Sequence, residues 1–189
     1  MVATENRNAV SNLIAAYEGE LNSHAKYMAF AIKAESEGHL GAASLFRAAA
    51  RAEQIHAGNH ARVIRQMGGR AEAEIYPVQV KSTLENLRAA LGGELNEIDS
   101  LYPALLKYAT SQLDTAAVRS FVWAMESEKT HAKLYGDAVE TLERGAGDSW
   151  TRAQLEFYVC SLCGYTAKTP EAENCPACNF LWERFEVIR

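Results

Sequence analysis

The motif Glu-x-x-His, which occurs twice, constrains the fold of this chain more than any other feature. The copies are Glu53 with His56 and Glu128 with His131, so the glutamates and the histidines are separated by the same interval. Residues three positions apart lie on one face of a helix, so each copy presents a carboxylate and an imidazole side by side. A single copy is usually a solvated surface pair, whereas two matched copies indicate two helices that face a common centre.

Two further glutamates extend this repeat. Glu20 and Glu94 are separated by almost the same interval, and each lies within an apolar stripe of its own predicted helix. The chain therefore looks like one helix pair used twice, with a glutamate and a Glu-x-x-His motif from each half. Buried carboxylates are costly without a partner, and oxygen-rich ligation with one imidazole per metal suits iron or manganese better than zinc. The combination is the di-iron carboxylate pattern of four-helix bundles.

Four long helices are expected over residues 5–37, 40–67, 82–108 and 114–144. Ser82 and Glu85 fit a capping box at the start of the third helix, and Asp114 suits the N-cap of the fourth. Pro103 predicts a bend within the third helix. The connection 68–81 is long enough to cross the bundle while the other connections are short, which is the ferritin-like arrangement.

Glu97 breaks the repeat, because the matching position in the first half is Ser23. Glu97 follows Glu94 by three residues and shares its helical face. One interpretation is a surface glutamate; the other is a fifth carboxylate ligand that makes the two metal positions inequivalent. An added anionic ligand favours ferric iron, so Glu97 would join on oxidation and leave on reduction, with His56 as its replacement on the reduced metal.

Two tyrosines, Tyr27 and Tyr102, follow the two helix glutamates by seven and eight residues. They are either ordinary core aromatics or hydroxyl donors to the ligating carboxylates. His24 and His60 have no repeat partner, and we interpret them as packing or surface residues, not ligands.

All four cysteines of the chain lie close to its C-terminal end as two C-x-x-C pairs: Cys160, Cys163, Cys175 and Cys178. Two such knuckles offer four thiolates to one tetrahedral ion. Gly164 and Asn179 follow the knuckles, where a residue that tolerates positive φ helps the backbone to turn. So short a module needs a metal for its stability. The spacing alone suits iron and zinc equally.

Composition excludes several classes of protein. Hydrophobic residues make up 48% and charged residues 23% of the chain, with a net charge of −5 and no Lys/Arg stripe, so neither disorder nor a nucleic-acid partner is expected. No apolar run is long enough to span a membrane, and residues 1–7 do not resemble a signal peptide. We therefore expect a cytoplasmic protein whose cysteines bind metal.

On these residues the chain resembles the rubrerythrin family over essentially its whole length. The expected fold is mainly α, with a ferritin-like bundle over 1–148 and a rubredoxin-like metal-knuckle domain over 149–189. The match rests on the carboxylate, histidine and cysteine positions together: Glu20, Glu53, His56, Glu94, Glu97, Glu128, His131, Cys160, Cys163, Cys175 and Cys178. Asn179 stands where rubredoxins usually have glycine, a difference expected to change the hydrogen bonds to sulfur and so the reduction potential.

The resemblance implies a role for each of these positions. Glu53 and Glu128 would bridge two irons. Glu20 would be terminal on one iron, where His56 and Glu97 exchange with redox state, and Glu94 and His131 would complete the other. The resemblance also implies tyrosines beside the ligands, one iron held by the four cysteines, and a homodimer or higher homo-oligomer in which the cysteine site of one subunit serves the di-iron site of the other. The expected catalytic residues are Glu97, His56, Tyr27 and Tyr102.

The expected function is a peroxidase of oxidative-stress defence that reduces hydrogen peroxide to water. Its electrons would pass through the FeS₄ centre from rubredoxin or an NAD(P)H-dependent reductase, since the chain has no G-x-G-x-x-G nucleotide motif of its own. Two alternatives stay open. One is a ferritin-like ferroxidase that handles iron; the other is a structural or regulatory module with zinc in the knuckles.

Overall fold

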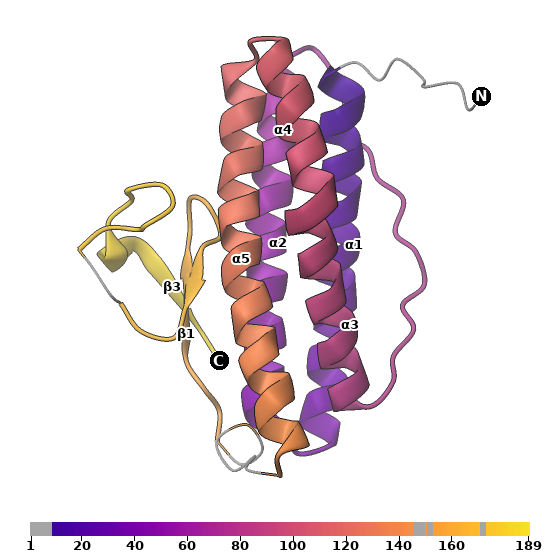
Figure 1. Ribbon diagram of the computed structural model, residues 1–189, viewed down its shortest axis with the longest axis vertical. Helices are drawn as coiled ribbons and strands as arrows, with labels where there is room; N and C mark the ends of the chain where they lie inside the picture. Colours follow the sequence, from indigo (N-terminus) through magenta and orange to yellow (C-terminus); the bar gives the residue numbers. More distant parts are fainter. Residues whose placement is uncertain (1–8, 146–149, 151–152, 171–172) are drawn as a thin grey trace.

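The computed structural model describes residues 9–145, 150, 153–170 and 173–189, which form a long helical bundle with a small sheet on its side (Figure 1). The bundle consists of α1 (Ala9–Ser36), α2 (Leu40–Gln66), α3 (Thr83–Asn96), α4 (Tyr102–Ser111) and α5 (Thr115–Glu143). The expected start of the first helix at residue 5 lies outside the described residues. In the described part of the chain, no helix is long and apolar enough to cross a membrane.

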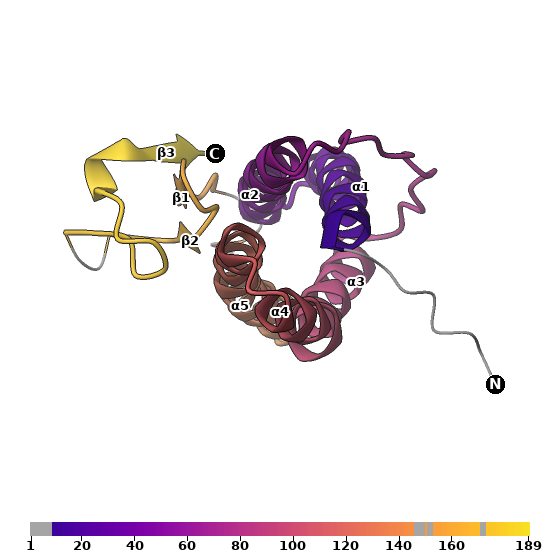
Figure 2. The same ribbon diagram turned by 90° about the horizontal axis from the view of Figure 1, so that it is seen from above.

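The helix ends follow the capping signals in the sequence. Ser82 and Glu85 form the expected capping box before α3, and the side chain of Asp114 accepts a hydrogen bond from the backbone of Ala117 at the start of α5. Figure 2 shows the helices as a ring in which α1 lies beside α2 and α3, and α5 lies beside α2. The connection between α2 and α3 runs along the outside of α1 and α3. This is the expected ferritin-like arrangement.

The third helix is interrupted by a π-helical turn, η1 (Glu97–Leu101), where Pro103 had predicted a bend. The backbone N–H of Tyr102 donates to the carbonyl of Glu97, five residues earlier. In an α-helix, a residue seven positions after a glutamate lies on the same face, because seven residues complete about two turns. A residue eight positions later would be rotated away from that face, but the wider π turn accommodates the extra residue. Tyr102 therefore faces the bundle centre as Tyr27 does, although its distance from the glutamate is one residue longer.

Helix α2 is buried around most of its circumference. Its many alanines, among them Ala42, Ala49 and Ala52, are fully buried, and such small side chains let neighbouring elements approach closely. The bundle covers one side of α2, and the C-terminal domain covers another (Figure 2). Apolar clusters around Phe46 and Phe121 fill the two ends of the bundle interior.

The C-terminal domain is an antiparallel sheet of β1 (Phe157–Cys160), β2 (Thr166–Ala167) and β3 (Phe185–Ile188) in the order β2-β1-β3. A short 3₁₀ helix, η2 (Trp182–Arg184), precedes β3, and Trp182 stacks on Phe185 with ring centroids 3.8 Å apart. The expected domain boundary, between residues 148 and 149, lies outside the described residues. Just after it, Trp150 is buried and packs near Phe157.

Candidate metal centres

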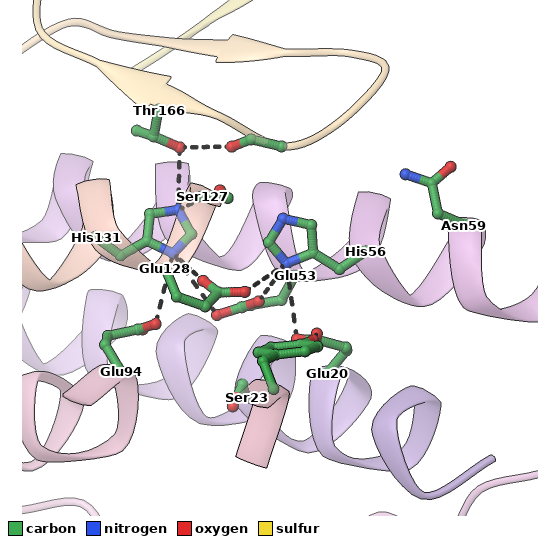
Figure 3. Close-up of polar contacts among 12 residues, drawn as sticks. Glu20, Ser23, Glu53, His56, Asn59, Glu94, Ser127, Glu128, His131 and Thr166 are labelled. Carbon is green, nitrogen blue, oxygen red and sulfur yellow. Dashed lines mark hydrogen bonds and ion pairs between the residues drawn. The ribbon is translucent and has the colours of Figure 1, made fainter. Parts of the chain in front are cut away.

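Six buried ligand-type side chains from four helices converge inside the bundle (Figure 3). They are Glu20 from α1, Glu53 and His56 from α2, Glu94 from α3, and Glu128 and His131 from α5. Their ligand atoms fall into two groups, each with atoms within 4.8 Å of one another, and both groups share Glu53 and Glu128. The two shared carboxylates therefore lie where bridging ligands of a dinuclear metal site would lie.

The two halves of the site are arranged alike. In one, Nδ1 of His56 lies 3.0 Å from Glu53 Oε2, 3.0 Å from Glu128 Oε1 and 3.7 Å from Glu20 Oε2. In the other, Nδ1 of His131 lies 2.7 Å from Glu128 Oε2 and 3.7 Å from Glu94 Oε2. Each imidazole thus directs the same nitrogen at the carboxylates, as the repeat predicts.

The electrostatics of this group fit divalent or trivalent cations. Buried oxygens of Glu20, Glu53, Glu94 and Glu128 have no hydrogen-bond partner among the described residues. Burial and the neighbouring Glu128 raise the pKa of Glu94 to about 7. Burial lowers the pKa of His131, but the close carboxylates of Glu128 and Glu94 outweigh it and raise that pKa to about 9. Without cations the group holds protons, and metal binding would displace them.

Two tyrosine hydroxyls fix the outer carboxylates. Tyr27 donates to Glu94 Oε1, and Tyr102 donates to Glu20 Oε1, so each tyrosine serves the carboxylate of the opposite half. Burial and the adjacent carboxylates raise the pKa of both phenols well above the usual value, which keeps them protonated as donors. The structure therefore places both residues as hydroxyl donors and not only as core aromatics.

Glu97 lies beside the site but in neither ligand group. Its Oε2 atom is buried and has no hydrogen-bond partner among the described residues. Burial and the carboxylates of Glu20 and Glu94 raise its pKa well above the usual value. The structure thus turns one oxygen of this half-buried glutamate inward, and His56, not Glu97, accompanies Glu20 in the ligand group.

His60 contacts the site in a way the sequence did not reveal. It is fully buried; its Nδ1 lies 2.7 Å from Ser120 Oγ, and its Nε2 lies 3.3 Å from the Tyr102 hydroxyl and 3.5 Å from Glu20 Oε1. Its spacing of four residues from His56 was the available signal. His24, in contrast, contacts the Ala50 carbonyl at 2.7 Å and has a packing role.

The four cysteines form the second centre. Their sulfur atoms lie within 4.8 Å of one another, and the Cys160–Cys178 and Cys163–Cys175 pairs are each 3.6 Å apart. A tetrahedral ion with bonds of about 2.3 Å to sulfur needs sulfurs roughly 3.8 Å apart, so the cluster fits one such ion. Gly164 and Asn179 adopt positive φ angles of 86° and 62°, as expected for the turns behind the knuckles.

The cysteine domain reaches both histidines of its own chain. Thr166 Oγ1 lies 3.1 Å from His131 Nε2 and donates to the Gly164 carbonyl at 2.9 Å (Figure 3). The threonine oxygen must therefore accept from His131 Nε2–H, which leaves Nδ1 free to bind a metal. On the other imidazole, a Cβ built on Gly164 would collide with Nε2 and Cδ2 of His56.

Polar contacts with α2 also hold this domain in place. Arg51 forms a two-point ion pair with Glu186, with both N···O distances 2.7 Å. Asn59 donates to the Leu162 carbonyl at 2.8 Å, close to the first knuckle. Within the chain, the cysteine domain therefore lies on α2 and α5, which present matching groups to the sheet. Service of another subunit's di-iron site, which the family resemblance implies, stays a prediction.

Comparison with known proteins agrees with this architecture. The family model described as Rubrerythrin matches residues 11–139. Rubrerythrin-2 of Clostridium acetobutylicum is 31% identical over 99% of this chain and 100% of the relative, and nigerythrin of Nitratidesulfovibrio vulgaris is 34% identical over 90% and 82%. The solved structure of fully reduced, all-ferrous nigerythrin superposes with a TM-score of 0.84 at 32% identity, covering 99% of this chain and 91% of the other.

A bacterioferritin shares the fold at lower identity. The Desulfovibrio desulfuricans protein, with its di-iron site, has a TM-score of 0.71 at 20% identity and covers 92% of this chain and 94% of its own.

Proposed function

The chain belongs to the rubrerythrin family of oxidoreductases, and we propose that it is a di-iron peroxidase that reduces hydrogen peroxide to water. The reaction is H₂O₂ + 2e⁻ + 2H⁺ → 2H₂O, with electrons relayed through an iron in the four-cysteine site. The observation that carries this proposal is the contact of the cysteine domain with both His56 and His131. An electron donor built against the ligands suits a site that must be reduced again after every turnover.

The residues present would hold two irons, because each group brings its ligand atoms within 4.8 Å of one another. Glu53 and Glu128 would bridge them, with Glu20 and His56 on one side and Glu94 and His131 on the other. When bound, two ferrous ions would supply one electron each to the O–O bond. Tyr27 and Tyr102 keep Glu94 and Glu20 oriented, and full burial of these side chains keeps bulk water away.

The proposed exchange between His56 and Glu97 is supported by their positions. His56 belongs to a ligand group, and Glu97 lies outside it with a buried oxygen that has no partner among the described residues. This arrangement corresponds to the one expected for the reduced site. A neutral imidazole suits ferrous iron, and an additional carboxylate suits ferric iron, so a carboxylate held ready beside the site stabilises the oxidised form when it binds.

Electrons would reach the bundle along the knuckle. Cys163 is bonded to Gly164, which touches the His56 ring, and Thr166 leads to His131. The external donor would be rubredoxin or an NAD(P)H-dependent reductase, and we place the protein in the cytoplasm as a homodimer. A ferritin-like ferroxidase is the competing function, favoured only by the shared bundle fold. It gives no reason for an electron-donating domain seated on the ligands.

Anaerobic stopped-flow tests the proposal. Fully reduced, iron-loaded protein is mixed with hydrogen peroxide while the absorption of the FeS₄ site is followed. We expect rapid reoxidation at two electrons per peroxide, slowed in Glu97→Ala and unchanged in Glu140→Ala, whose exposed side chain pairs only with Arg144 in the described structure. An FeS₄ site that stays reduced while peroxide persists would exclude the peroxidase, and faster oxidation by O₂ than by peroxide would favour the ferroxidase.

A further inference from the structure

A chain of hydrogen bonds crosses four helices and ends on one outer carboxylate of the metal site. It runs from Ser120 on α5 to His60 on α2, then to Tyr102 at the start of α4 and to Glu20 on α1. All four side chains are buried. Only Glu20 belongs to a ligand group, so the other three side chains reach the metal site through it.

The direction of each hydrogen bond follows from the one nearest the metal site. Tyr102 donates its O–H to Glu20 Oε1, so its oxygen can only accept from His60 Nε2, which lies 3.3 Å away. Nε2 therefore carries the ring proton. A neutral imidazole has one donor and one acceptor, so Nδ1 accepts from the Ser120 hydroxyl at 2.7 Å. Every bond of the chain thus donates in the same sense, from Ser120 towards Glu20.

Neighbouring helices hold the two rings in this arrangement. The Phe121 ring lies 5.4 Å from the His60 ring and 6.1 Å from the Tyr102 ring, measured between centroids. Tyr102 directly follows the π turn η1, where the regular α-helical hydrogen bonds are interrupted. The direction of its hydroxyl is therefore set by contacts from other helices, and His60 supplies the donated hydrogen bond.

The matching positions in the other half of the bundle provide no such chain. In the internal repeat, Tyr135 matches His60 and Leu45 matches Ser120. The Tyr135 hydroxyl is buried without a hydrogen-bond partner in the described part of the chain, although its ring lies 5.6 Å from that of Tyr27. Leu45 lies in the same apolar cluster and has no group to donate. The support of the outer carboxylates therefore differs between the two halves.

This difference bears on the charge that each half offers to a metal. Hydrogen bonds in a buried chain strengthen one another, so donation by His60 makes the Tyr102 hydroxyl a stronger donor to Glu20. A carboxylate that accepts a stronger hydrogen bond offers less negative charge to a bound cation. The less charged, ferrous state is then favoured on the Glu20 side, and Glu94 lacks this effect.

We propose that His60, with its ring proton fixed on Nε2 by Ser120, is a positioning residue that holds the Tyr102 hydroxyl on Glu20 and makes the two metal positions inequivalent. It favours the reduced state at the Glu20 position and so raises the reduction potential there. This inference rests on the di-iron site of the proposed function and does not depend on the reaction with peroxide.

The tautomer of His60 is tested by nitrogen-15 NMR of the full chain loaded with Zn²⁺, a diamagnetic probe metal. We expect the ring proton on Nε2 in the parent, and a shifted Nδ1 resonance in Ser120→Ala, which removes the hydrogen bond to that nitrogen. A proton on Nδ1 in the parent, or an Nδ1 resonance that Ser120→Ala does not move, would overturn the proposal. This measurement needs neither iron nor peroxide, so it is independent of the proposed peroxidase activity.

The effect on iron is tested by anaerobic spectroelectrochemical titration of the iron-loaded protein without peroxide. His60→Leu removes the donor, His60→Gln keeps an N–H group at the distance of Nε2, and the side chain of His60→Asn is too short to reach Tyr102. Tyr135→Phe is the matched control, because it changes the corresponding residue of the other half and removes a hydroxyl with no partner among the described residues. Thermal unfolding shows whether each variant folds, and the comparison of His60→Gln with His60→Asn keeps the test open if His60→Leu does not.

We expect His60→Leu and His60→Asn to lower the reduction potential and to weaken the preference for the reduced site roughly fivefold, the effect of losing one hydrogen bond. His60→Gln and Tyr135→Phe should stay close to the parent value. In a Tyr102→Phe background, His60→Leu should have little further effect, because His60 acts through the Tyr102 hydroxyl. Equal potentials in His60→Gln and His60→Asn, or the same shift with and without that hydroxyl, would overturn the proposal and leave His60 a packing residue.

Discussion

At the scale of single residues, Gly164 determines how closely the cysteine domain approaches the bundle. Its φ of +86° suits the turn behind the first knuckle, and its missing side chain leaves room for the His56 ring. The same residue thus meets a backbone requirement and an interdomain requirement. The backbone requirement can be separated from the interdomain requirement by comparison with a glycine that has a positive φ but no neighbour close to it.

Gly164→Ala should slow electron transfer from the FeS₄ site to the bundle, because the new methyl group would push the knuckle away from His56. Gly38→Ala is the control, since Gly38 has a φ of +79° and nothing within 4 Å of an added Cβ. Both variants should lose about 1 kcal/mol of stability to backbone strain, measured by denaturant unfolding. Only Gly164→Ala should show slower FeS₄ reoxidation in stopped-flow; equal rates in the two variants would contradict the contact.

At the scale of the elements, the end of α1 holds the start of α3. Glu37 accepts hydrogen bonds from the backbone N–H of Thr83 at 2.8 Å and from its hydroxyl at 2.6 Å. These bonds satisfy a free donor at the first turn of α3 and join helices that are distant in sequence. The Thr83 bonds, with a smaller effect of Lys33, lower the pKa of Glu37 to about 2.

Glu37→Gln should therefore destabilise the protein by about 1 kcal/mol at neutral pH, a modest value because the carboxylate is exposed to solvent. A lowered folded-state pKa means that Glu37 stabilises the fold fully above its ordinary pKa of 4.5 and loses this effect as the pH falls towards 2. Urea unfolding of both proteins should show a constant difference above about pH 5 that shrinks in acid. A difference independent of pH would show that the charge has no part in the cap.

The sequence predicted the helices well because their signals are local. The capping box at Ser82, the N-cap at Asp114 and the spacing of the Glu-x-x-His motifs are each contained in a few residues, and the structure contains all of them. The π turn at 97–101 was not predicted, although the sequence contains a sign of it: Tyr102 follows Glu94 by eight residues, where Tyr27 follows Glu20 by seven. A bend was expected at Pro103, and the structure has a π-helical turn with one extra residue just before this proline.

Contacts between distant segments were not predictable in the same way. His56 contacts Gly164, and His131 contacts Thr166, but no sequence motif links the two residues of either pair. The sequence identified each as part of a helix or a knuckle but carried no sign that the two would touch. His60 was missed for a related reason, because its partners Ser120 and Tyr102 come from other helices.

At the scale of the whole molecule, the seating of the cysteine domain brings it next to the di-iron site of its own chain. The Arg51–Glu186 ion pair and the Asn59 hydrogen bond seat the domain on the helices of its own chain. These contacts favour electron transfer within one chain, whereas the family resemblance implies transfer between subunits, and the two routes predict different results in one experiment.

Co-expression of two defective variants tests this prediction. One lacks the cysteine site (Cys160→Ser with Cys163→Ser), and the other lacks the bridging carboxylates (Glu53→Ala with Glu128→Ala). Transfer within the chain predicts that mixed oligomers regain no FeS₄ reoxidation by peroxide, because each intact cysteine domain lies on a defective bundle. Recovery approaching half of the parent rate would show transfer between subunits.

The position of the cysteine domain also affects whether it must move during the reaction. The domain lies against α2 and α5, whereas the connection between α2 and α3 runs along α1 and α3 on the other side of the ring (Figure 2). A pocket of about 570 Å³ lies beneath that connection and is lined by residues such as Asn22 and Lys81. A small molecule that entered from that side would have no need to displace the domain. Entry there would let the domain stay docked on α2 and α5 from one turnover to the next, so its release would set no limit on the rate.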